Sequence, residues 1–387
     1  MRRVTFSRNY TLSLSRTCRC YCKYCAFATH RAHLHPPEEV ERMLDDAARR
    51  GSKELLVLTG EQPEVNPEVA ERLRDYGHED FTSYVVWACE RALERGLLPH
   101  SNLGVLERED LARLREVNAS MGLMLESVSE RLMETVHAGS PTKHPAARLA
   151  TIEEAGAQRI PFTSGILVGI GETEEERIAS LEALAEVHAR HGHIQEVILQ
   201  NFVPHPRYHG QEVGEIADRA AHERWSGNGE VVTRDAALPE WATPVTVEDL
   251  KRLVRHCRQV MPEVGVQIPP NLSDWWSDLV HEGATDLGGL SANGDTSPRS
   301  IRSRAPTRCG SGSGRRGSRS RSGCASTPST SPRTGWRRAC STRSRGATGR
   351  SSRGAAPGAA TATRSRSLSR PARSRRGATG RRSLPPS

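Results

Sequence analysis

The sequence predicts an α/β protein: a parallel eight-stranded barrel of the TIM type, written (β/α)8, followed by a disordered tail. Strand-type and helix-type segments alternate along the chain up to about residue 290. Eight strands in such alternation imply a parallel sheet, and eight is the number that closes a barrel. Beyond residue 296 the composition changes abruptly. We therefore expect two parts, a barrel over residues 1–296 and a tail over residues 297–387.

The expected strands are short apolar runs, and the expected helices are amphipathic segments between them. The strands cover residues 10–14, 54–59, 98–103, 121–126, 160–168, 196–202, 265–268 and 284–290. The helices cover residues 37–50, a pair within 67–95, 107–117, 145–155, 174–190, 247–260 and 274–281. Residues 203–246 are the least regular stretch, and we expect them to form a long loop over the barrel mouth.

One helix carries its own boundary signals. Thr173 precedes three glutamates, which places a hydroxyl cap and negative charge at the start of the helix 174–190. Gly192 follows that helix, where a residue in the left-handed conformation commonly ends a helix. These signals favour a strand–loop–helix unit over residues 165–192.

A strong charge asymmetry separates the two parts. Residues 297–387 contain 23 Arg and no Lys, Asp or Glu, so residues 1–296 hold 32 basic side chains and all 46 acidic ones. The net charge of +9 therefore combines about −14 on the barrel region with +23 on the tail. The tail has one aromatic residue, Trp336, and too little apolar surface to offset chain entropy, which predicts disorder.

Two hypotheses account for the tail. A native arginine-rich arm would bind nucleic acid strongly and without sequence preference, so a nucleic-acid-binding protein is one alternative function. The same Arg, Ser, Gly, Ala, Pro and Thr composition arises when a GC-rich gene is read out of frame, and we favour a frameshift near residue 296. We expect no nucleic-acid partner unless the tail is native.

Cysteine usage indicates the cellular compartment. Four of the six cysteines in the barrel region lie within residues 18–25, too close together to form a disulfide framework. No stretch approaches the 18 apolar residues of a membrane span, and residues 1–17 lack the apolar region of a secretory signal. We expect a protein of the reducing cytoplasm, with no membrane partner and with a metal site.

The cysteines Cys18, Cys22 and Cys25 follow the first strand with the spacing C-x3-C-x2-C. In a barrel this is the C-terminal face, where active sites form. Three thiolates on a four-iron cluster leave one iron open to a small molecule. The alternative is a structural zinc site that uses all four cysteines, Cys20 included, or the nearby His30, His33 and His35.

Further polar residues stand at the ends of other strands. Gly60 and Glu61 follow the second strand, and Glu126 ends the fourth. Gly169 lies in a glycine-rich turn after the fifth strand, which could also be read as a dinucleotide-binding G-x-G-x-x-G, but Glu174 occupies the place of the third glycine. The sixth strand ends in Gln200, Asn201 and Phe202. All of these belong to the predicted mouth of the barrel.

The cysteine triad, with Tyr24 just before its last member, resembles the signature of the radical S-adenosylmethionine (SAM) superfamily. The resemblance implies a [4Fe–4S] cluster on Cys18, Cys22 and Cys25, with SAM bound to the open iron and reductively cleaved to an adenosyl radical. It also implies that Gly60 and Glu61 receive the SAM amino group and that Gly169 supports the adenine. The other candidate cofactor contacts are Tyr24, Glu126, Gln200, Asn201 and Phe202.

A closer resemblance is to the cyclising subunit, CofG, of 7,8-didemethyl-8-hydroxy-5-deazariboflavin (FO) synthase. It is carried by residues 98–102, 117–127, 137–149, 160–173, 193–202, 266–272 and 288–289. It implies a lyase of coenzyme F420 biosynthesis that closes the deazaflavin ring of 5-amino-5-(4-hydroxybenzyl)-6-(D-ribitylimino)-5,6-dihydrouracil and expels ammonia. A CofH-type subunit would supply this substrate, and ferredoxin or flavodoxin would supply electrons. The alternative within the superfamily is the tyrosine-transferring partner subunit itself.

Overall fold

The computed structural model describes residues 4–203, 238–288, 291–293 and 321–322. The chain divides into two units, residues 1–329 and 330–387, and the second lies wholly outside the described residues. The predicted disorder of the tail therefore falls outside what the structure describes, apart from residues 321–322. Within the predicted loop over 203–246, residues 204–237 are likewise not described.

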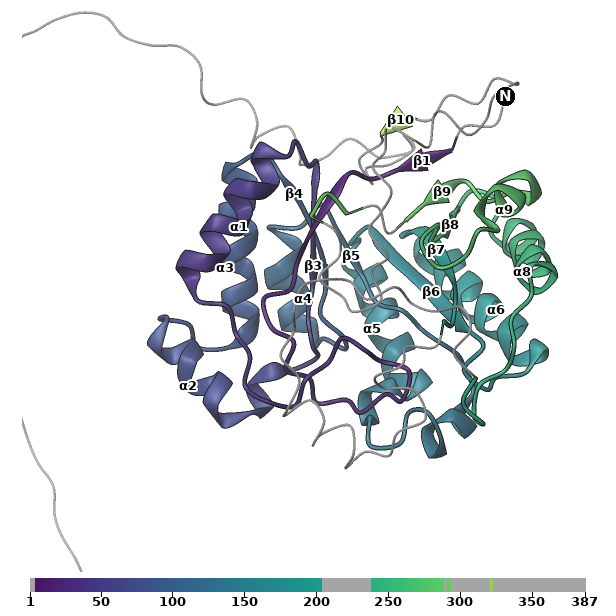
Figure 1. Cartoon of the computed structure of the whole chain (residues 1–387), viewed down its shortest axis with the longest axis horizontal. Helices are drawn as coiled ribbons and strands as arrows, with labels where there is room; N and C mark the ends of the chain where they lie inside the picture. Colours follow the sequence, from purple (N-terminus) through teal and green to yellow (C-terminus); the bar gives the residue numbers. More distant parts are fainter. Residues whose placement is uncertain (1–3, 204–237, 289–290, 294–320, 323–387) are drawn as a thin grey trace, which may run out of the picture. The chain divides into compact units, whose positions relative to one another are not determined.

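The described strands form one parallel sheet (Figure 1). Its order is β10-β1-β9-β8-β7-β6-β5-β4-β3-β2, and every pair of neighbours is parallel. The strands are β1 Thr5–Phe6, β2 Asn9–Leu12, β3 Glu54–Leu58, β4 Leu98–Asn102, β5 Ser120–Gly122, β6 Phe162–Val168, β7 Ile194–Asn201, β8 Gly265–Ile268, β9 Asp286–Leu287 and β10 Arg321–Ser322.

The N-terminal segment joins the two ends of this sheet. β1 pairs with β9, and β2 pairs with β3. A parallel bridge links Asn9 to Ser291, and the Ala292 N–H donates to the Asn9 carbonyl at 2.8 Å. The α/β barrel prediction is confirmed. The expected first strand at 10–14 corresponds to β2, and two short strands that the sequence did not predict, β1 and β10, lie beside the eight expected ones. β1 and β2 are separate strands because they pair with different neighbours.

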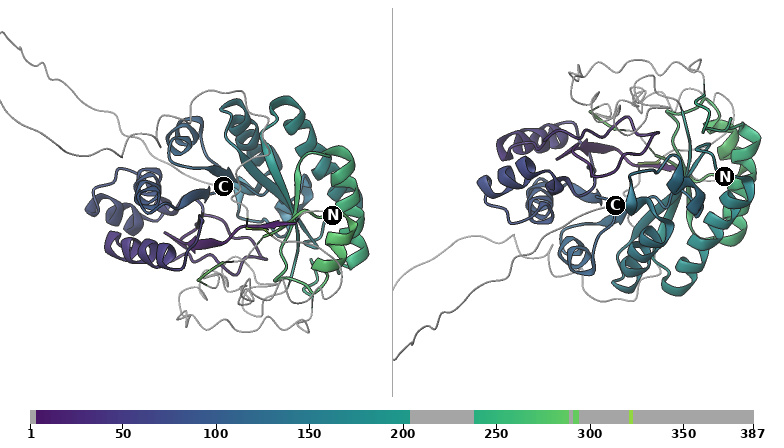
Figure 2. Two further views of the ribbon diagram at one scale, coloured as in Figure 1. Left: turned by 90° about the horizontal axis from the view of Figure 1, so that it is seen from above. Right: turned by 90° about the horizontal axis from the view of Figure 1, so that it is seen from below.

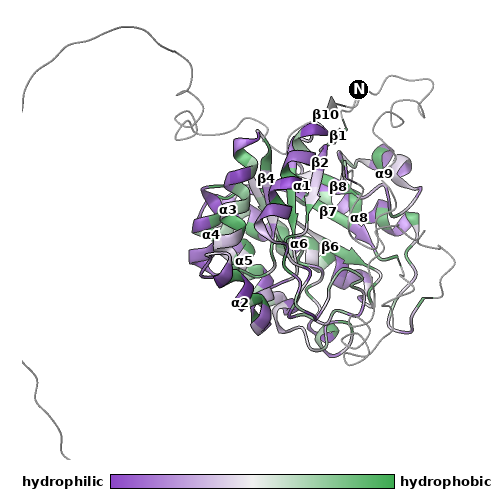
Figure 3. Cartoon of the chain, turned by 60° about the vertical axis from the view of Figure 1, so that its left-hand side comes forward, coloured by the Kyte–Doolittle hydropathy of each residue, from purple (hydrophilic) through white to green (hydrophobic). Residues whose placement is uncertain are grey.

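The helices lie on the outer side of the curved sheet (Figure 2). The outward faces of α1, α3 and α4 are hydrophilic (Figure 3), as expected for amphipathic helices around a buried sheet. In α1 the residues Val40, Leu44 and Ala47 are buried at helical spacing. The α-helices are α1 Pro37–Arg49, α2 Pro67–Asp75, α3 Phe81–Glu94, α4 Arg108–Arg115, α5 Pro145–Ala157, α6 Glu174–His191, α8 Val247–Val260 and α9 Trp276–Glu282.

The predicted caps of α6 are confirmed. The Thr173 hydroxyl accepts the Glu176 N–H at 3.2 Å, and the Glu176 carboxylate accepts the Thr173 N–H at 2.7 Å. Gly192 ends the helix in the left-handed conformation, with φ of 63°. No helix in the described part of the chain is both long and apolar enough to cross a membrane.

Two strands are shorter than expected. β5 ends at Gly122, although the sequence predicts a strand to residue 126. Glu126 itself has φ of 67°, a left-handed conformation outside the β region, and only an isolated bridge joins it to Ile166. β9 covers Asp286–Leu287 of the expected 284–290, and residues 289–290 are not described.

Candidate functional site

A cavity of about 380 Å³ lies at the C-terminal ends of the strands, beneath the cysteine loop. It is lined by residues of β3, β4, β7 and β8 and by residues that follow β3, β4, β5 and β8. The sequence-predicted residues in its lining are Cys18, Cys22, Cys25, Tyr24, Gly60, Glu61, Glu126 and Gln200. The remaining three, Gly169, Asn201 and Phe202, do not line it.

The cysteine loop is held from both ends by main-chain hydrogen bonds. The Cys18 N–H donates to the Thr29 carbonyl at 3.0 Å, and the Lys23 N–H donates to the Val136 carbonyl at 2.9 Å. The Cys18 sulfur accepts two backbone N–H groups, from Cys20 at 3.4 Å and from Glu61 at 3.3 Å. Such N–H donors stabilise a thiolate that binds a cluster.

The fourth cysteine of the loop, Cys20, is buried and also lines the cavity. Its sulfur lies 3.1 Å from the Thr142 hydroxyl. A hydrogen bond with Cys18, together with burial, raises the pKa of Cys20 to about 12. Cys20 is therefore a protonated thiol beside the triad unless a metal displaces its proton.

The histidines of the zinc hypothesis have other partners. His30 Nδ1 lies 2.9 Å from the Cys18 carbonyl, His33 Nδ1 accepts the Arg16 N–H at 3.1 Å, and His35 pairs with Glu39 at 2.9 Å. Among the described residues, no group of three or more His, Cys, Asp or Glu side chains is arranged to hold a single metal ion. The geometry therefore gives no support to a zinc site in the described part of the chain.

Gly60 permits the loop after β3 to approach the cysteine loop. A Cβ atom at this position would lie 2.0 Å from the Thr17 carbonyl oxygen. This close approach brings the Glu61 N–H to the Cys18 sulfur and the Arg19 N–H to the Glu61 carbonyl at 3.0 Å. The glycine therefore ties the second loop to the cysteine loop.

The Glu61 carboxylate is buried in the cavity wall. Its Oε2 atom lies 3.7 Å from an Arg148 guanidinium nitrogen, and its Oε1 atom has no hydrogen-bond partner among the described residues. Gly104 makes room for it, since a Cβ there would lie 2.2 Å from Glu61 Cγ. A buried, unpartnered carboxylate oxygen fits a ligand ammonium group such as the amino group of SAM.

Glu126 forms the second buried ion pair of the cavity. Lys143 Nζ donates to Glu126 Oε1 at 2.7 Å, and both side chains are almost completely buried. Burial alone would raise the pKa of Glu126, but Lys143 and Arg148 outweigh it and hold that pKa below its usual range. The carboxylate therefore stays ionised. The backbone of Glu126 has a strained left-handed conformation at the cavity wall.

Sequence reasoning assigned no role to Lys143 or Arg148. Burial and Arg148 oppose the charged form of Lys143, yet Glu126 holds the pKa of Lys143 above its usual range. Arg148 is buried and lies beside Glu61. Both cations line the cavity, although they belong to a segment without strand character, so strand ends alone could not reveal them.

Tyr24 lines the cavity between two triad cysteines. Its hydroxyl lies 3.0 Å from His137 Nε2, and Lys143 Nζ lies 5.8 Å from the centre of its ring. Burial lowers the pKa of His137 to about 3, so this histidine is neutral. The hydrogen bond and the cation–π contact fix the tyrosine ring in place.

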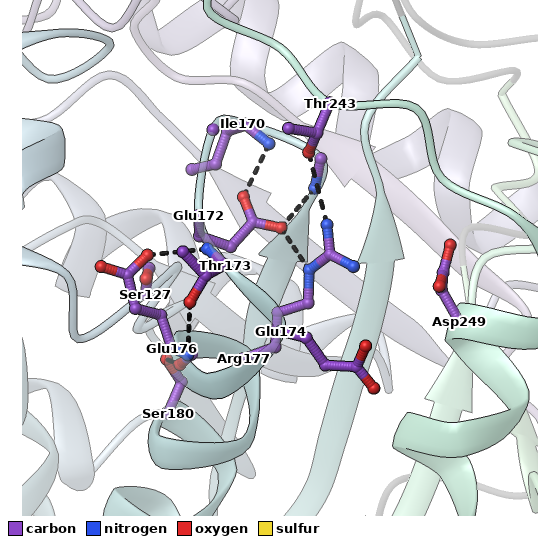
Figure 4. A network of polar contacts seen from close by, with 12 residues as sticks. Ser127, Ile170, Glu172, Thr173, Glu174, Glu176, Arg177, Ser180, Thr243 and Asp249 are labelled. Carbon is purple, nitrogen blue, oxygen red and sulfur yellow. Dashed lines mark hydrogen bonds and ion pairs between the residues drawn. The ribbon is translucent and has the colours of Figure 1, made fainter.

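The glycine-rich turn after β6 is an internally bonded loop (Figure 4). The Glu172 carboxylate accepts the N–H groups of Gly169 at 2.7 Å and Ile170 at 2.8 Å and pairs with Arg177 at 2.6 Å. Gly169 has φ of 101°, and a Cβ there would lie 2.5 Å from Val245. The turn supports the cavity wall from outside, and its contact with adenine stays a prediction.

Strand alternation explains part of the lining near the end of β7. Ile198 and Gln200 face the cavity, as residues two apart on a strand do, and the next residue, Asn201, is buried outside the lining. Phe202 lies beyond the last residue of the strand; it is buried outside the lining, and its ring packs 5.1 Å from that of Trp241. Roles for Asn201 and Phe202 in cofactor binding stay predictions, because ring packing accounts for Phe202 in this structure.

Comparison with solved structures shows the same fold in other proteins, among them two enzymes. The [FeFe]-hydrogenase maturase HydG from Carboxydothermus hydrogenoformans matches with a TM-score of 0.56 at 18% identity, over 79% of this chain and 63% of that one. Methylornithine synthase (PylB) matches with a TM-score of 0.53 at 16% identity, over 75% of this chain and 73% of that one. At such low identity these similarities concern the fold alone.

Sequence comparison adds the family. Residues 12–184 match the model of the Radical SAM superfamily, whose members use a [4Fe–4S] cluster and SAM. The 7,8-didemethyl-8-hydroxy-5-deazariboflavin synthase of Archaeoglobus fulgidus is 40% identical over 293 residues, covering 75% of this chain and 80% of that protein. The corresponding protein of Methanosphaerula palustris is 42% identical over 291 residues, covering 74% and 79%. The chain therefore belongs to the 7,8-didemethyl-8-hydroxy-5-deazariboflavin synthase family of radical SAM enzymes.

Proposed function

We propose that this chain catalyses the ring-closing step of FO synthesis in coenzyme F420 biosynthesis. The substrate is 5-amino-5-(4-hydroxybenzyl)-6-(D-ribitylimino)-5,6-dihydrouracil, and the products are FO and ammonia. The observation that carries the proposal is the 40% identity over 293 residues to an enzyme named for this product. The cavity supports it, because three cysteines and an unpartnered carboxylate oxygen line the same space.

The residues at the cavity fit the two cofactors. We assign Cys18, Cys22 and Cys25 to the cluster, Glu61 to the SAM amino group and Glu126 to a SAM hydroxyl. When bound, the cluster and SAM supply a carbon-centred radical that abstracts a hydrogen atom from the substrate. Arg148 keeps one Glu61 oxygen occupied, so that the other remains directed at the ligand.

Other side chains suit a flat, polar substrate that carries no phosphate. The amides of Asn102 and Gln200 line the cavity and can pair with uracil carbonyl and N–H groups. Leu56 and Leu58 provide apolar wall. Because its pKa is held above the usual range, Lys143 keeps its proton and acts as a fixed positive charge, not as a base.

The partners and location follow from the same reaction. We propose that a CofH-type subunit supplies the substrate and that ferredoxin or flavodoxin delivers the electron. The reaction is assigned to the reducing cytoplasm, in keeping with the free thiols of Cys18, Cys20, Cys22, Cys25, Cys89 and Cys257. We also propose that the barrel domain spans residues 1–296 and that residues 297–387 are a disordered tail apart from Arg321–Ser322, which pair with β1.

Anaerobic reconstitution tests the proposal. Protein with iron and sulfide restored, together with SAM, a reductant and the hydroxybenzyl adduct, should form FO, detected by its fluorescence, and release ammonia. Cys18→Ala, Cys22→Ala and Cys25→Ala should each abolish SAM cleavage, whereas Cys20→Ala should largely spare it. Loss of the cluster in Cys20→Ala alone would show that the ligand assignment is wrong.

The alternatives give different results in the same preparation. If the chain were the tyrosine-transferring subunit, tyrosine and 5-amino-6-ribitylaminouracil would yield the adduct without any added partner. Zinc in place of iron and sulfide would indicate a structural metal site. Nucleic-acid binding that falls steeply with salt, and that vanishes when residues 297–387 are deleted, would assign a role to the tail.

A further inference from the structure

A segment distant in sequence supports the cysteine loop from one side. Residues 136–143, which include the 3-10 helix Pro141–Lys143, contact three consecutive residues of the loop after its first cysteine. Besides the bond between Cys20 and Thr142, the Tyr21 N–H donates to Ser140 Oγ at 2.8 Å. The third contact joins Cys22 Sγ to Ser140 Oγ at 3.7 Å. One hydroxyl, that of Ser140, thus contacts both the loop backbone and a triad sulfur.

Ser140 is rigidly placed. It is buried, its N–H donates to the His137 carbonyl at 2.9 Å, and its carbonyl accepts the Lys143 N–H at 2.9 Å. The Tyr21 N–H occupies one lone pair of its hydroxyl oxygen. The hydroxyl proton remains, and the Cys22 sulfur is the acceptor that the structure places within reach, as far as the described residues extend.

The direction of this hydrogen bond depends on the state of Cys22. A free thiol can donate its proton to Ser140 Oγ. A cysteine that binds iron is a thiolate and has no proton, so the hydroxyl must then donate to the sulfur. Hydrogen bonds to a cluster thiolate withdraw electron density and favour the reduced cluster, which carries the more negative charge.

We propose that Ser140 is a positioning residue of the iron–sulfur cluster, whose hydroxyl donates to Cys22 Sγ and raises the reduction potential of the cluster. The inference rests on the assignment of Cys22 as a cluster ligand. Cys18 differs in that its sulfur accepts backbone N–H groups, which substitution of a side chain does not remove. The donor to Cys22 is a side chain, so it can be deleted.

Three variants test the role of the hydroxyl. Ser140→Ala removes it, Ser140→Thr retains it, and Thr142→Val removes the neighbouring contact to Cys20 as a matched control. The readouts are the iron and sulfide content and the midpoint potential of the cluster. The potential is measured without SAM, by a redox titration monitored with electron paramagnetic resonance. We expect a lower midpoint potential in Ser140→Ala at full iron content, and wild-type potentials in Ser140→Thr and Thr142→Val.

An iron-replete Ser140→Ala with the wild-type potential would overturn the proposal, as would an equal shift in Thr142→Val. If Ser140→Ala binds no iron, the proposal requires that Ser140→Thr, which keeps the hydroxyl, binds iron normally. A threonine variant that also lacks iron would show that loss of the hydroxyl does not explain the loss of iron. The FO assay is independent of this titration. Wild-type protein with a titratable cluster but no FO formation would refute the proposed reaction and leave the role of Ser140 standing.

Discussion

At the mouth of the barrel, the buried carboxylates Glu61 and Glu126 each lie beside a buried cation, Arg148 and Lys143 respectively. At the opposite end, the floor of the barrel where the strands begin, the buried carboxyl groups of Glu54 and Asp286 and the half-buried one of Glu196 have neutral hydrogen-bond partners. Buried carboxyl groups thus occur at both ends, and the two ends differ in the counter-charge.

The floor shows what burial does without a cation. Burial raises the pKa of Glu54 to about 7, and burial with the neighbouring acids raises that of Glu196 to about 8. Burial also raises the pKa of Asp286 to about 6. The cations at the mouth therefore keep Glu126 ionised for ligand binding, whereas at the floor Glu196, and in part Glu54, hold protons near neutral pH.

Removing the cation at the mouth should have the largest effect on stability. Lys143→Met leaves Glu126 buried without its partner, and breaking such a pair costs about 3–5 kcal/mol. Denaturant unfolding should show this loss, and Lys143→Met with Glu126→Gln should recover much of it. The matched control is Lys251→Met, which removes a surface ion pair of similar length, 2.8 Å, with Glu248 and should change stability little. Equal losses in both variants would contradict the assigned role of burial.

A second test concerns ligand binding at the mouth. Glu61→Gln removes the charge that faces the ligand ammonium, and the lost interaction of about 1.5–3 kcal/mol should weaken SAM binding roughly 10- to 150-fold. Calorimetry on cluster-containing protein measures the affinity, and iron content should stay at the wild-type level. Glu64→Gln changes a nearby half-buried glutamate outside the cavity lining; it serves as control and should bind SAM normally. Unchanged affinity in Glu61→Gln would make Glu61 a structural turn residue.

The carboxyl groups of the floor should make the stability of the protein depend on pH. Since their pKa values are higher in the folded protein than in the unfolded chain, protonation favours folding. This contribution is fully present below about pH 4.5 and is lost as pH rises towards 8. Glu196→Gln should therefore raise the free energy of unfolding at pH 8 by about 2 kcal/mol and have little effect near pH 5. The exposed Glu71→Gln should do neither; a pH-independent effect of Glu196→Gln would refute the assignment.

The smallest effect is expected from the tail. Deleting residues 297–387 should leave thermal stability unchanged or higher, because the arginine-rich composition provides little apolar surface to bury. The deletion removes β10, whose two residues pair with β1, and such a short ladder contributes little. Restoring a frame-corrected C-terminus should raise stability and FO formation. A sharp fall in melting temperature when residues 297–387 are deleted would contradict the frameshift hypothesis.

Local sequence signals predicted much of the fold and part of the site. Periodicity located the helices, and the Thr173 capping box was visible in the sequence because capping depends on residues three apart. The spacing of the cysteine triad and the adjacent Gly60 and Glu61 predicted the cavity, because these too are patterns of residues close together in the sequence. Periodicity could not show that Thr5 and Asn9 pair with different strands, since that depends on closure of the sheet.

By itself, the sequence determined the alternation of strands and helices, the cysteine triad and the change of composition at residue 297, because each is a pattern of neighbouring residues. Only the tertiary structure decided which charges meet. Lys143 reaches Glu126 across 17 residues, and Ser140 reaches Cys22 across 118. Their energies depend on burial and distance, and no local pattern specifies either quantity. The counter-charges of the cavity and the hydroxyl beside the cysteine loop therefore became visible only in the folded barrel.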